Sequence, residues 1–176
     1  MPLPLAHGLL GATAAAATLP RETPPPSLRR ALLLAALLGV CPDFDYLLNL
    51  FPALGGGWHH GFTHSLAFAA LAGLFAAAVS RQRRRAFVAA FLLAAVSHTL
   101  LDLLLTESRG VELFWPFSAR RFRLRFPNPI DYSWSQTSAR AAALDVAKIC
   151  AWEFALFAPP LAAVLAFRRG PLRRAG

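Results

Sequence analysis

The side chains of this sequence that could do chemistry are five histidines and three of the aspartates, all placed near the ends of apolar stretches. They are His7, Asp43, Asp45, His59, His60, His64, His98 and Asp102. Charged side chains within apolar helices need a partner, because a carboxylate at mid-membrane costs roughly 2.5–3.5 kcal/mol on insertion scales. A metal ion is a natural partner for such aspartates and histidines.

The spacing of these residues favours convergence. His98 and Asp102 are four residues apart and therefore share one face of a helix. His59 and His64 lie on either side of Gly61, at a turn from a loop into a helix where both side chains can converge. Each of the two pairs can therefore supply two ligands to one site.

An Asp-x-Asp pair completes the set. Asp43 and Asp45 directly follow Pro42, and such a pair can ligate one ion or bridge two. Imidazole and carboxylate ligands without thiolate suit zinc, manganese, iron or magnesium. The ligands outnumber those that one tetrahedral ion uses, so a site with two ions and a bridging water as nucleophile is also consistent with the sequence. The expected cofactor is a divalent metal, as one or two ions.

The composition indicates a membrane protein. Of the 176 residues, 56% are hydrophobic and 15% are charged, and the mean hydropathy is +0.47. This is too apolar for an ordinary soluble domain. The net charge of +9 comes largely from arginines in short runs between apolar segments, as in membrane topology signals. No recognised nucleic-acid-binding fold or basic helix face is present, so we expect a lipid bilayer as partner and no nucleic acid.

The expected fold is all-α, a single membrane-embedded domain (residues 1–176) built as a helical bundle of four to five spanning helices with a polar outer connection. The expected spans are residues 3–19, 31–50, 62–80, 86–105 and 149–167. Pro159 and Pro160 are expected to kink or break the last span. Glu153 lies in the same apolar segment and is a candidate functional residue by default. For residues 1–19, a cleaved signal peptide is the alternative.

The distribution of arginine predicts the topology. Residues 21–30, 81–85 and 168–176 are rich in arginine, so the positive-inside bias places these stretches and the C-terminus in the cytoplasm. The loop 42–61 and the connection 106–136 then face outward. In an up-and-down bundle, the four ligand-bearing ends all lie at one membrane face. This holds whichever way the protein is inserted.

Five motifs together suggest a family. They are His7, Pro42-Asp43-Phe44-Asp45, His59-His60-Gly61-Phe62-Thr63-His64-Ser65, Ser97-His98-x-x-x-Asp102 and Leu113-Phe114-Trp115-Pro116-Phe117. This pattern, over about residues 4–117, resembles the YdjM-like membrane-bound metal-dependent hydrolases, small inner-membrane proteins of bacteria and archaea. In that family the position of His60 is usually Arg. The resemblance implies a metal-dependent hydrolase in the cell inner membrane, so the outward face is periplasmic.

The expected function is therefore a membrane-bound hydrolase, in which a metal-activated water attacks a phosphoester or similar bond of a small-molecule or lipid substrate. The expected metal ligands are His59, His64, His98, Asp43 and Asp102, with His7 and Asp45 as further ligands. Asp45 is also the candidate general base. His60 is the other candidate catalytic residue, facing substrate or solvent. The alternatives are a metal-ion binding or transport protein, and a structural membrane protein in which metal staples helix ends.

Overall fold

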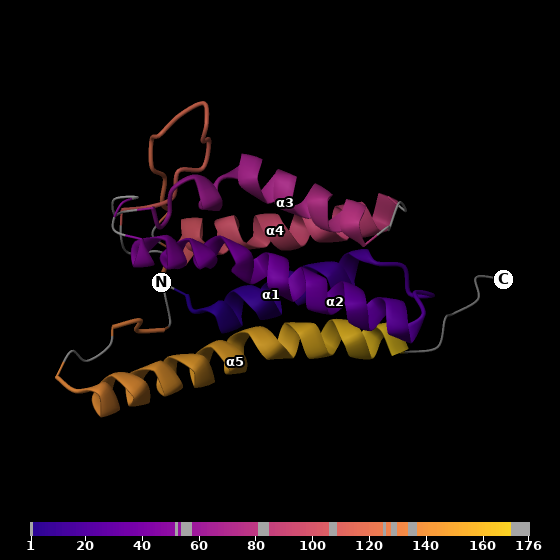
Figure 1. The fold of residues 1–176 in the computed structure, drawn as a ribbon. Coiled ribbons are helices and arrows are strands. Elements are labelled where there is room, and N and C mark those ends of the chain that lie inside the picture. Colours follow the sequence, from indigo (N-terminus) through magenta and orange to yellow (C-terminus); the bar gives the residue numbers. More distant parts are fainter. Residues whose placement is uncertain are drawn as a thin grey trace.

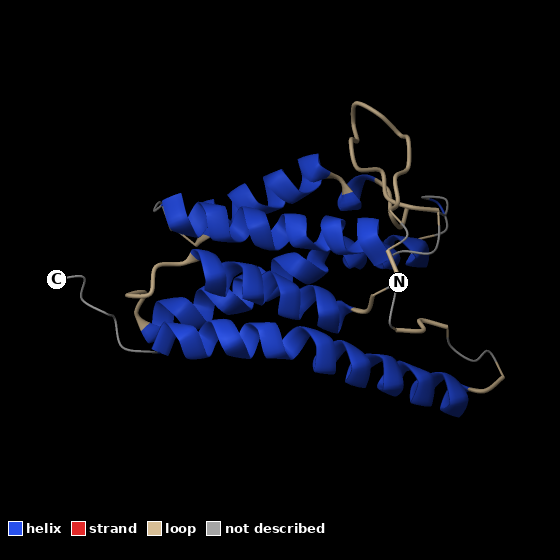
Figure 2. Ribbon diagram, turned by 180° about the vertical axis from the view of Figure 1, so that it is seen from behind, coloured by secondary structure: helices blue, strands red, loops and turns tan. Residues whose placement is uncertain are grey.

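The structure is a computed structural model that describes residues 2–51, 53, 58–80, 85–105, 109–124, 126–127, 130–133 and 137–169. Within these ranges the chain forms α1 (Pro4–Thr18), α2 (Pro25–Val40), α3 (Leu66–Val79), α4 (Arg85–Leu105) and α5 (Ala139–Arg169), together with the 3-10 helices η1 (Cys41–Leu50) and η3 (Phe62–His64). The β pairing found among the described residues is one isolated bridge between Val111 and Phe122. The prediction of an all-α bundle is confirmed, as Figure 1 and Figure 2 show.

The α-helices run roughly side by side (Figure 1). α1 packs on α2, α4 and α5, while α3 packs mainly on α4. Small and apolar side chains fill these contacts, and the core includes Ala15, Ala35, Ala69, Ala90 and Phe91, each at most 1% exposed. Lipid tails are as apolar as the helices, so close packing of small residues is the expected source of association in such a bundle.

Two glycines let α1 and α2 approach closely. A Cβ on Gly11 would lie 2.5 Å from the carbonyl oxygen of Ala35, and a Cβ on Gly39 would overlap the carbonyl oxygen of His7. A larger residue at either position would force the helices apart. The close approach sets the first turn of α1, which carries His7, against the last turn of α2.

Three helical stretches of the described chain are long and apolar enough to cross a membrane, Pro25–Leu48, Arg85–Leu105 and Ala139–Arg169. They correspond to the second, fourth and fifth predicted spans. The first and third predicted spans form helices of only 15 and 14 residues, α1 and α3. At about 1.5 Å per residue, these helices are shorter than the ~30 Å hydrocarbon core. α3 begins late because the preceding histidine segment folds as η3.

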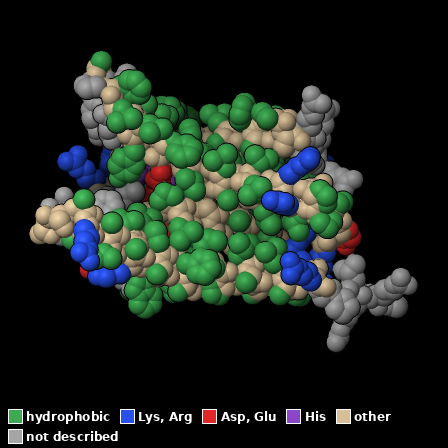
Figure 3. Space-filling view, turned by 60° about the horizontal axis from the view of Figure 1, so that its bottom comes forward, with side chains coloured by type: hydrophobic (Ala, Val, Ile, Leu, Met, Phe, Trp, Pro, Cys, Tyr) green, Lys and Arg blue, Asp and Glu red, His purple; other side chains and the backbone are tan. Residues whose placement is uncertain are grey.

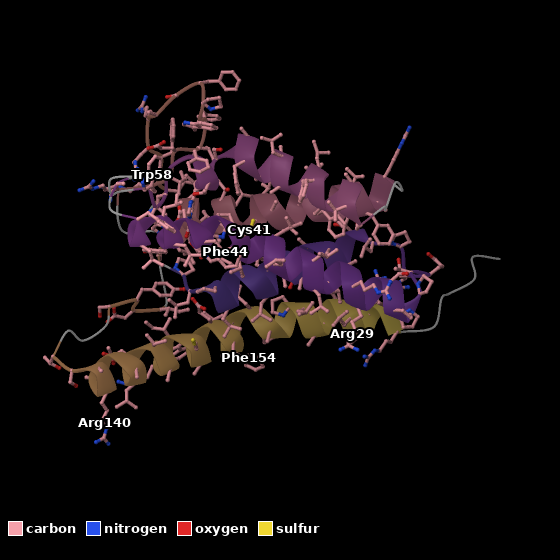
Figure 4. The ribbon with its side chains drawn as sticks, viewed as in Figure 1. Arg29, Cys41, Phe44, Trp58, Arg140 and Phe154 are labelled. Atoms are coloured by element: carbon pink, nitrogen blue, oxygen red, sulfur yellow. The ribbon has the colours of Figure 1, made fainter. Side chains whose placement is uncertain are left out.

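α5 is longer than the predicted span of residues 149–167. It begins at Ala139, where Ser138 caps the helix, and its 31 residues run through Pro159 and Pro160 without a break. The buried residues of α5 are Ile149 and Glu153. Other α5 side chains, such as that of Phe154 in Figure 4, point away from the bundle. Most of α5 therefore presents an apolar surface to its surroundings.

Basic side chains lie at the end of the bundle where the chain passes from the end of α1 to the start of α2. Arg29 lies there, at the opposite end from Trp58 (Figure 4). Arg168 donates a hydrogen bond to the carbonyl oxygen of Leu19 at 2.6 Å and so ties the end of α5 to the end of α1. The remaining arginines of the stretches 81–84 and 170–176 lie outside the described residues.

Candidate metal centre

The residues predicted to do chemistry lie at one end of the bundle, the end that holds the N-terminus in Figure 1. α1 supplies His7, η1 supplies Asp43 and Asp45, the turn before η3 and η3 itself supply His59, His60 and His64, and α4 supplies His98 and Asp102. The topological prediction that four separate segments meet at one end therefore matches the structure. The site is not preassembled by any single element, because each segment brings only one to three of these side chains.

Asp102 lies at the centre of the cluster and is fully buried. Its Oδ2 is 3.2 Å from Nε2 of His98 and 3.2 Å from Nε2 of His64. Its Oδ1 is 3.6 Å from Nε2 of His7. The ring of His7 stacks on that of His98 with 3.9 Å between the ring centroids, so α1 and α4 each place one imidazole at the same carboxylate.

Asp43 faces the same three histidines from the other side. Its Oδ1 lies 3.6 Å from Nε2 of His64 and 3.7 Å from Nε2 of His98. Its Oδ2 lies 4.0 Å from Nε2 of His7. Three imidazoles therefore sit between two carboxylates, an arrangement that concentrates ligand atoms in one small volume.

His7, Asp43, His98 and Asp102 lie close enough to one another to hold a cation, and His64 lies at similar distances from both carboxylates, although most of these separations are wider than those between neighbouring ligands of a bound ion. Metal bonds of about 2.0–2.2 Å to nitrogen and oxygen, at tetrahedral or octahedral angles, separate neighbouring ligand atoms by about 3.0–3.5 Å. The separations between the histidine nitrogens and carboxylate oxygens are 3.2–4.0 Å. Ligand atoms from His7, Asp43, His98 and Asp102 all lie within 4.8 Å of one another.

Unsatisfied polar atoms support the same interpretation. Several buried ligand atoms of the described cluster have no hydrogen-bond partner: both ring nitrogens of His7, Oδ1 of Asp43, Nε2 of His64, Nε2 of His98 and both carboxylate oxygens of Asp102. A buried polar group without a partner is costly, and such groups are rare in folded proteins. These buried atoms are therefore available to hold a metal ion.

Hydrogen bonds orient two of the histidines as they are oriented in metal sites. Nδ1 of His98 donates to the carbonyl oxygen of Gly39 at 2.7 Å, since a carbonyl can only accept. The neutral ring of His98 therefore carries its lone pair on Nε2, the atom that faces Asp43 and Asp102. Repulsion between this lone pair and the two carboxylates is relieved by a metal ion between them or by a second proton on the ring. Metal-binding histidines typically donate their other N–H to a carbonyl or a carboxylate in this way.

His64 is oriented by a chain of hydrogen bonds that ends at Asp45. The Thr63 hydroxyl donates to Oδ2 of Asp45 at 2.6 Å, so its oxygen is free to accept from Nδ1 of His64 at 2.9 Å. Oδ1 of Asp45 accepts from Nδ1 of His59 at 2.8 Å. Both oxygens of Asp45 therefore contact the histidine segment, and Nε2 of His64 is left facing the other two carboxylates.

The histidine turn places His60 beside the cluster, although the sequence led us to expect it facing solvent or substrate. His60 is 4% exposed, and its Nε2 lies 3.8 Å from Oδ2 of Asp102. Its backbone adopts the left-handed conformation at φ 63°, which is uncommon outside glycine. Glu112 N donates to the carbonyl oxygen of His60 and holds this turn from the polar connection. His59, His60 and His64 form a second group of potential ligands.

His60 and His64, which lie outside the apolar helices, differ in proton affinity. Burial lowers the pKa of His60 to about 3 and outweighs the raising effect of Asp102. Burial also acts to lower the pKa of His64, which precedes α3, but the carboxylates of Asp102 and Asp43 outweigh it and raise this pKa to about 9. The buried carboxylates therefore attract positive charge to His64.

Glu153 has a structural contact that its sequence position did not predict. It is fully buried, and its carboxylate accepts hydrogen bonds from the backbone N–H groups of Leu3 at 2.5 Å and Ala6 at 3.0 Å. N–H groups at the start of a helix have no partner within the helix, and negative charge is favourable there. Glu153 therefore anchors α5 to the helix that carries His7. A lone acidic residue in an apolar segment was the available signal, but its partner lies about 150 residues away in sequence.

Comparison with known proteins gives two matches. The family described as YdjM inner membrane protein matches residues 1–170. The inner membrane protein YbcI of Escherichia coli (strain K12) is 37% identical over 99 residues, which make up 53% of this chain and 57% of YbcI. The chain therefore matches little more than half the length of this relative. No solved structure matches.

Proposed function

This chain belongs to the family of YdjM inner membrane proteins, and from that premise we propose that it is a membrane-bound, metal-dependent hydrolase. His7, Asp43, His64, His98 and Asp102 hold the metal. A divalent metal in such a site supplies activation of water for attack on a phosphoester or similar bond, in a small-molecule or lipid substrate. The observation that carries this proposal is the convergence of buried, unpaired ligand atoms from four chain segments.

The remaining residues of the site act on the ligands and the substrate. Asp45 and Thr63 orient His59 and His64, because both oxygens of Asp45 accept hydrogen bonds, one from His59 and one from the Thr63 hydroxyl. His60 contributes a neutral ring beside Asp102, where it contacts the substrate. The site lies at the periplasmic face of the inner membrane.

Hydrolysis by the metal-loaded protein tests this proposal. Purified protein supplied with zinc, manganese, iron or magnesium is assayed for release of p-nitrophenol from p-nitrophenyl phosphate and bis-p-nitrophenyl phosphate. We expect metal-dependent turnover that falls at least about 100-fold in Asp43→Asn, because loss of a ligand costs more than loss of an outer partner. Asp131→Asn is the control, since that carboxylate is exposed and caps the local backbone. Equal turnover in both variants would contradict the assignment.

A metal staple without catalysis is the second candidate, and the burial of the site favours it. His7, His64, His98 and Asp102 are all 0% exposed, and structural metal sites are typically closed. In that case chelation lowers the midpoint of thermal unfolding strongly, and neither phosphoester is hydrolysed with any of the four metals. Turnover by the loaded protein excludes this candidate.

A further inference from the structure

A cavity of about 240 Å³ reaches the candidate metal centre from the side of η1. Its walls include the side chains of Leu3, Val40 and Phe44 and the rings of Tyr46 and Tyr132, and Asp43 lies among them. The described residues that line it include no lysine or arginine. The cavity is therefore apolar along its walls and acidic at the point where it meets the cluster.

The cavity meets the metal centre at Asp43. His7, His64, His98 and Asp102 are 0% exposed, whereas Asp43 is 8% exposed and lines the cavity. A molecule in the cavity therefore meets the five converging side chains at Asp43.

The cavity borders the surface that faces lipid. Val40 and Phe44 belong to the candidate span Pro25–Leu48. Phe44 and the neighbouring Leu47 are 50% and 56% exposed. Figure 3 shows acidic atoms at a gap between hydrophobic side chains, near the end of the bundle that holds the site. A ligand can thus reach Asp43 without crossing a polar surface.

The size of the cavity limits what it can hold. Pockets for drug-sized ligands usually measure about 300–1,000 Å³, so this smaller space admits only part of an amphiphile. The part next to the metal centre is a compact head group with the first portion of one apolar chain, and the rest of the chain extends along exposed residues such as Phe44. Because the described lining residues carry no positive charge, a metal held at the centre would meet the charge of the head group.

We propose that the cavity binds a single-chain amphiphilic phosphoester, which enters from the bilayer with its chain against Leu3, Val40 and Phe44 and its head group beside Asp43. This substrate class rests on the proposed hydrolase function. The cavity itself is a binding site that can be tested without hydrolysis.

The test uses dodecylphosphonate with a photoreactive diazirine on the fourth carbon of its chain, added to the full chain in lipid nanodiscs. A phosphonate has a carbon–phosphorus bond in place of the ester and is not hydrolysed. After irradiation, mass spectrometry maps the labelled residues. We expect labelling at residues 2–4 and 40–46 that excess unlabelled dodecylphosphonate suppresses and methylphosphonate does not.

Two variants of η1 provide the matched comparison. Phe44→Ser removes an apolar wall of the cavity, and we expect the competable labelling to fall at least about fivefold. Leu47→Ser changes a similarly exposed residue of η1 outside the cavity lining, and labelling should match wild type. Thermal unfolding of both variants verifies that they fold. Labelling that no competitor suppresses, or that falls equally in both variants, would overturn the proposal.

A parallel assay separates this proposal from the hydrolase. Dodecyl phosphate is supplied to the metal-loaded protein, and phosphate release is measured. Competable labelling without phosphate release from dodecyl phosphate or either nitrophenyl ester retains the cavity and overturns the hydrolase function. Hydrolysis of p-nitrophenyl phosphate without competable labelling does the reverse.

Discussion

At the scale of single residues, the candidate ligands are held by partners on their far side. His98 is fixed by the carbonyl oxygen of Gly39, and His64 by the hydroxyl of Thr63. In both rings Nδ1 is engaged, so Nε2 points to the carboxylates. The metal affinity of the site is thus expected to depend on residues that do not touch the metal.

Replacing Thr63 by valine tests this dependence. Thr63→Val keeps the shape of the side chain but removes the hydroxyl that joins Asp45 to His64. We expect metal affinity to fall about 10–100-fold, the range typical of lost outer partners, with unchanged stoichiometry at saturating metal. Isothermal titration calorimetry gives both quantities. Thr18→Val is the control, because that hydroxyl bonds only within α1 at the other end of the bundle. Wild-type affinity in Thr63→Val would show that His64 needs no such support.

The residues of the site could be predicted from the sequence, but the contacts that each side chain makes could not. Spacing identified His98 with Asp102 and the Asp-x-Asp pair as neighbours, and the structure places them together. The contacts of Asp45 depend on how η1 meets the histidine turn, which is a tertiary contact. The direction of His60 depends on its left-handed backbone, which nothing in the local sequence requires.

At the scale of elements, the site depends on how closely α1 and α2 pack. Gly39 has two roles there, since its carbonyl orients His98 and its lack of a side chain admits the backbone of His7. Helix interfaces in membranes often use small residues for such approach. The sequence shows that the first segment is rich in alanine and glycine. It does not show that Gly39 of α2 faces this segment, because that contact depends on the register between the two helices.

Gly39→Ala is expected to separate these helices and weaken the site. Its Cβ would overlap the carbonyl oxygen of His7, so the overpacking should cost on the order of 1–3 kcal/mol and displace His7 from His98. Metal content and the midpoint of thermal unfolding should both fall. Gly8→Ala is the matched control on α1, because its Cβ would meet Val40 Cγ2 at 3.5 Å, an ordinary contact. If both variants kept full metal content, the packing argument would be wrong.

The position of α1, which carries His7, also depends on its contact with α5. Glu153→Ala leaves the N–H groups of Leu3 and Ala6 without their partner, at about 1–3 kcal/mol for each buried donor. We expect a lower midpoint of thermal unfolding in detergent. The adjacent Trp152, 58% exposed, provides the control Trp152→Ala, which should unfold near the wild-type temperature. Equal midpoints for the two variants would show that α5 does not anchor α1.

At the scale of the whole molecule, charge and apolar surface are arranged as in a membrane protein. Figure 3 shows hydrophobic side chains across the middle of one face, with lysine and arginine near its two ends. The described arginines at one end include Arg29 and Arg168, and Arg140 lies toward the other. In the sequence, the arginines of residues 21–30, 81–85 and 168–176 outnumber those of residues 106–140. The positive-inside bias therefore favours a cytoplasmic position for the end opposite the metal centre.

Cysteine labelling in intact cells tests this orientation. In a background without Cys41 and Cys150, Ala119→Cys places a thiol on the exposed connection near the site, and Glu22→Cys places one at the opposite end. A membrane-impermeant maleimide should label the first and not the second, while permeabilised cells should show both labelled. The reverse pattern would place the metal centre in the cytoplasm.

The central claim is that the five converging side chains bind metal, and elemental analysis of the detergent-purified protein tests it most directly. We predict one or two equivalents of zinc, manganese, iron or magnesium per chain, and their loss in the folded double variant His64→Ala/Asp102→Ala. Absence of metal from the wild-type protein, even after reconstitution with each of these ions, would contradict the account, as would the same stoichiometry in the double variant.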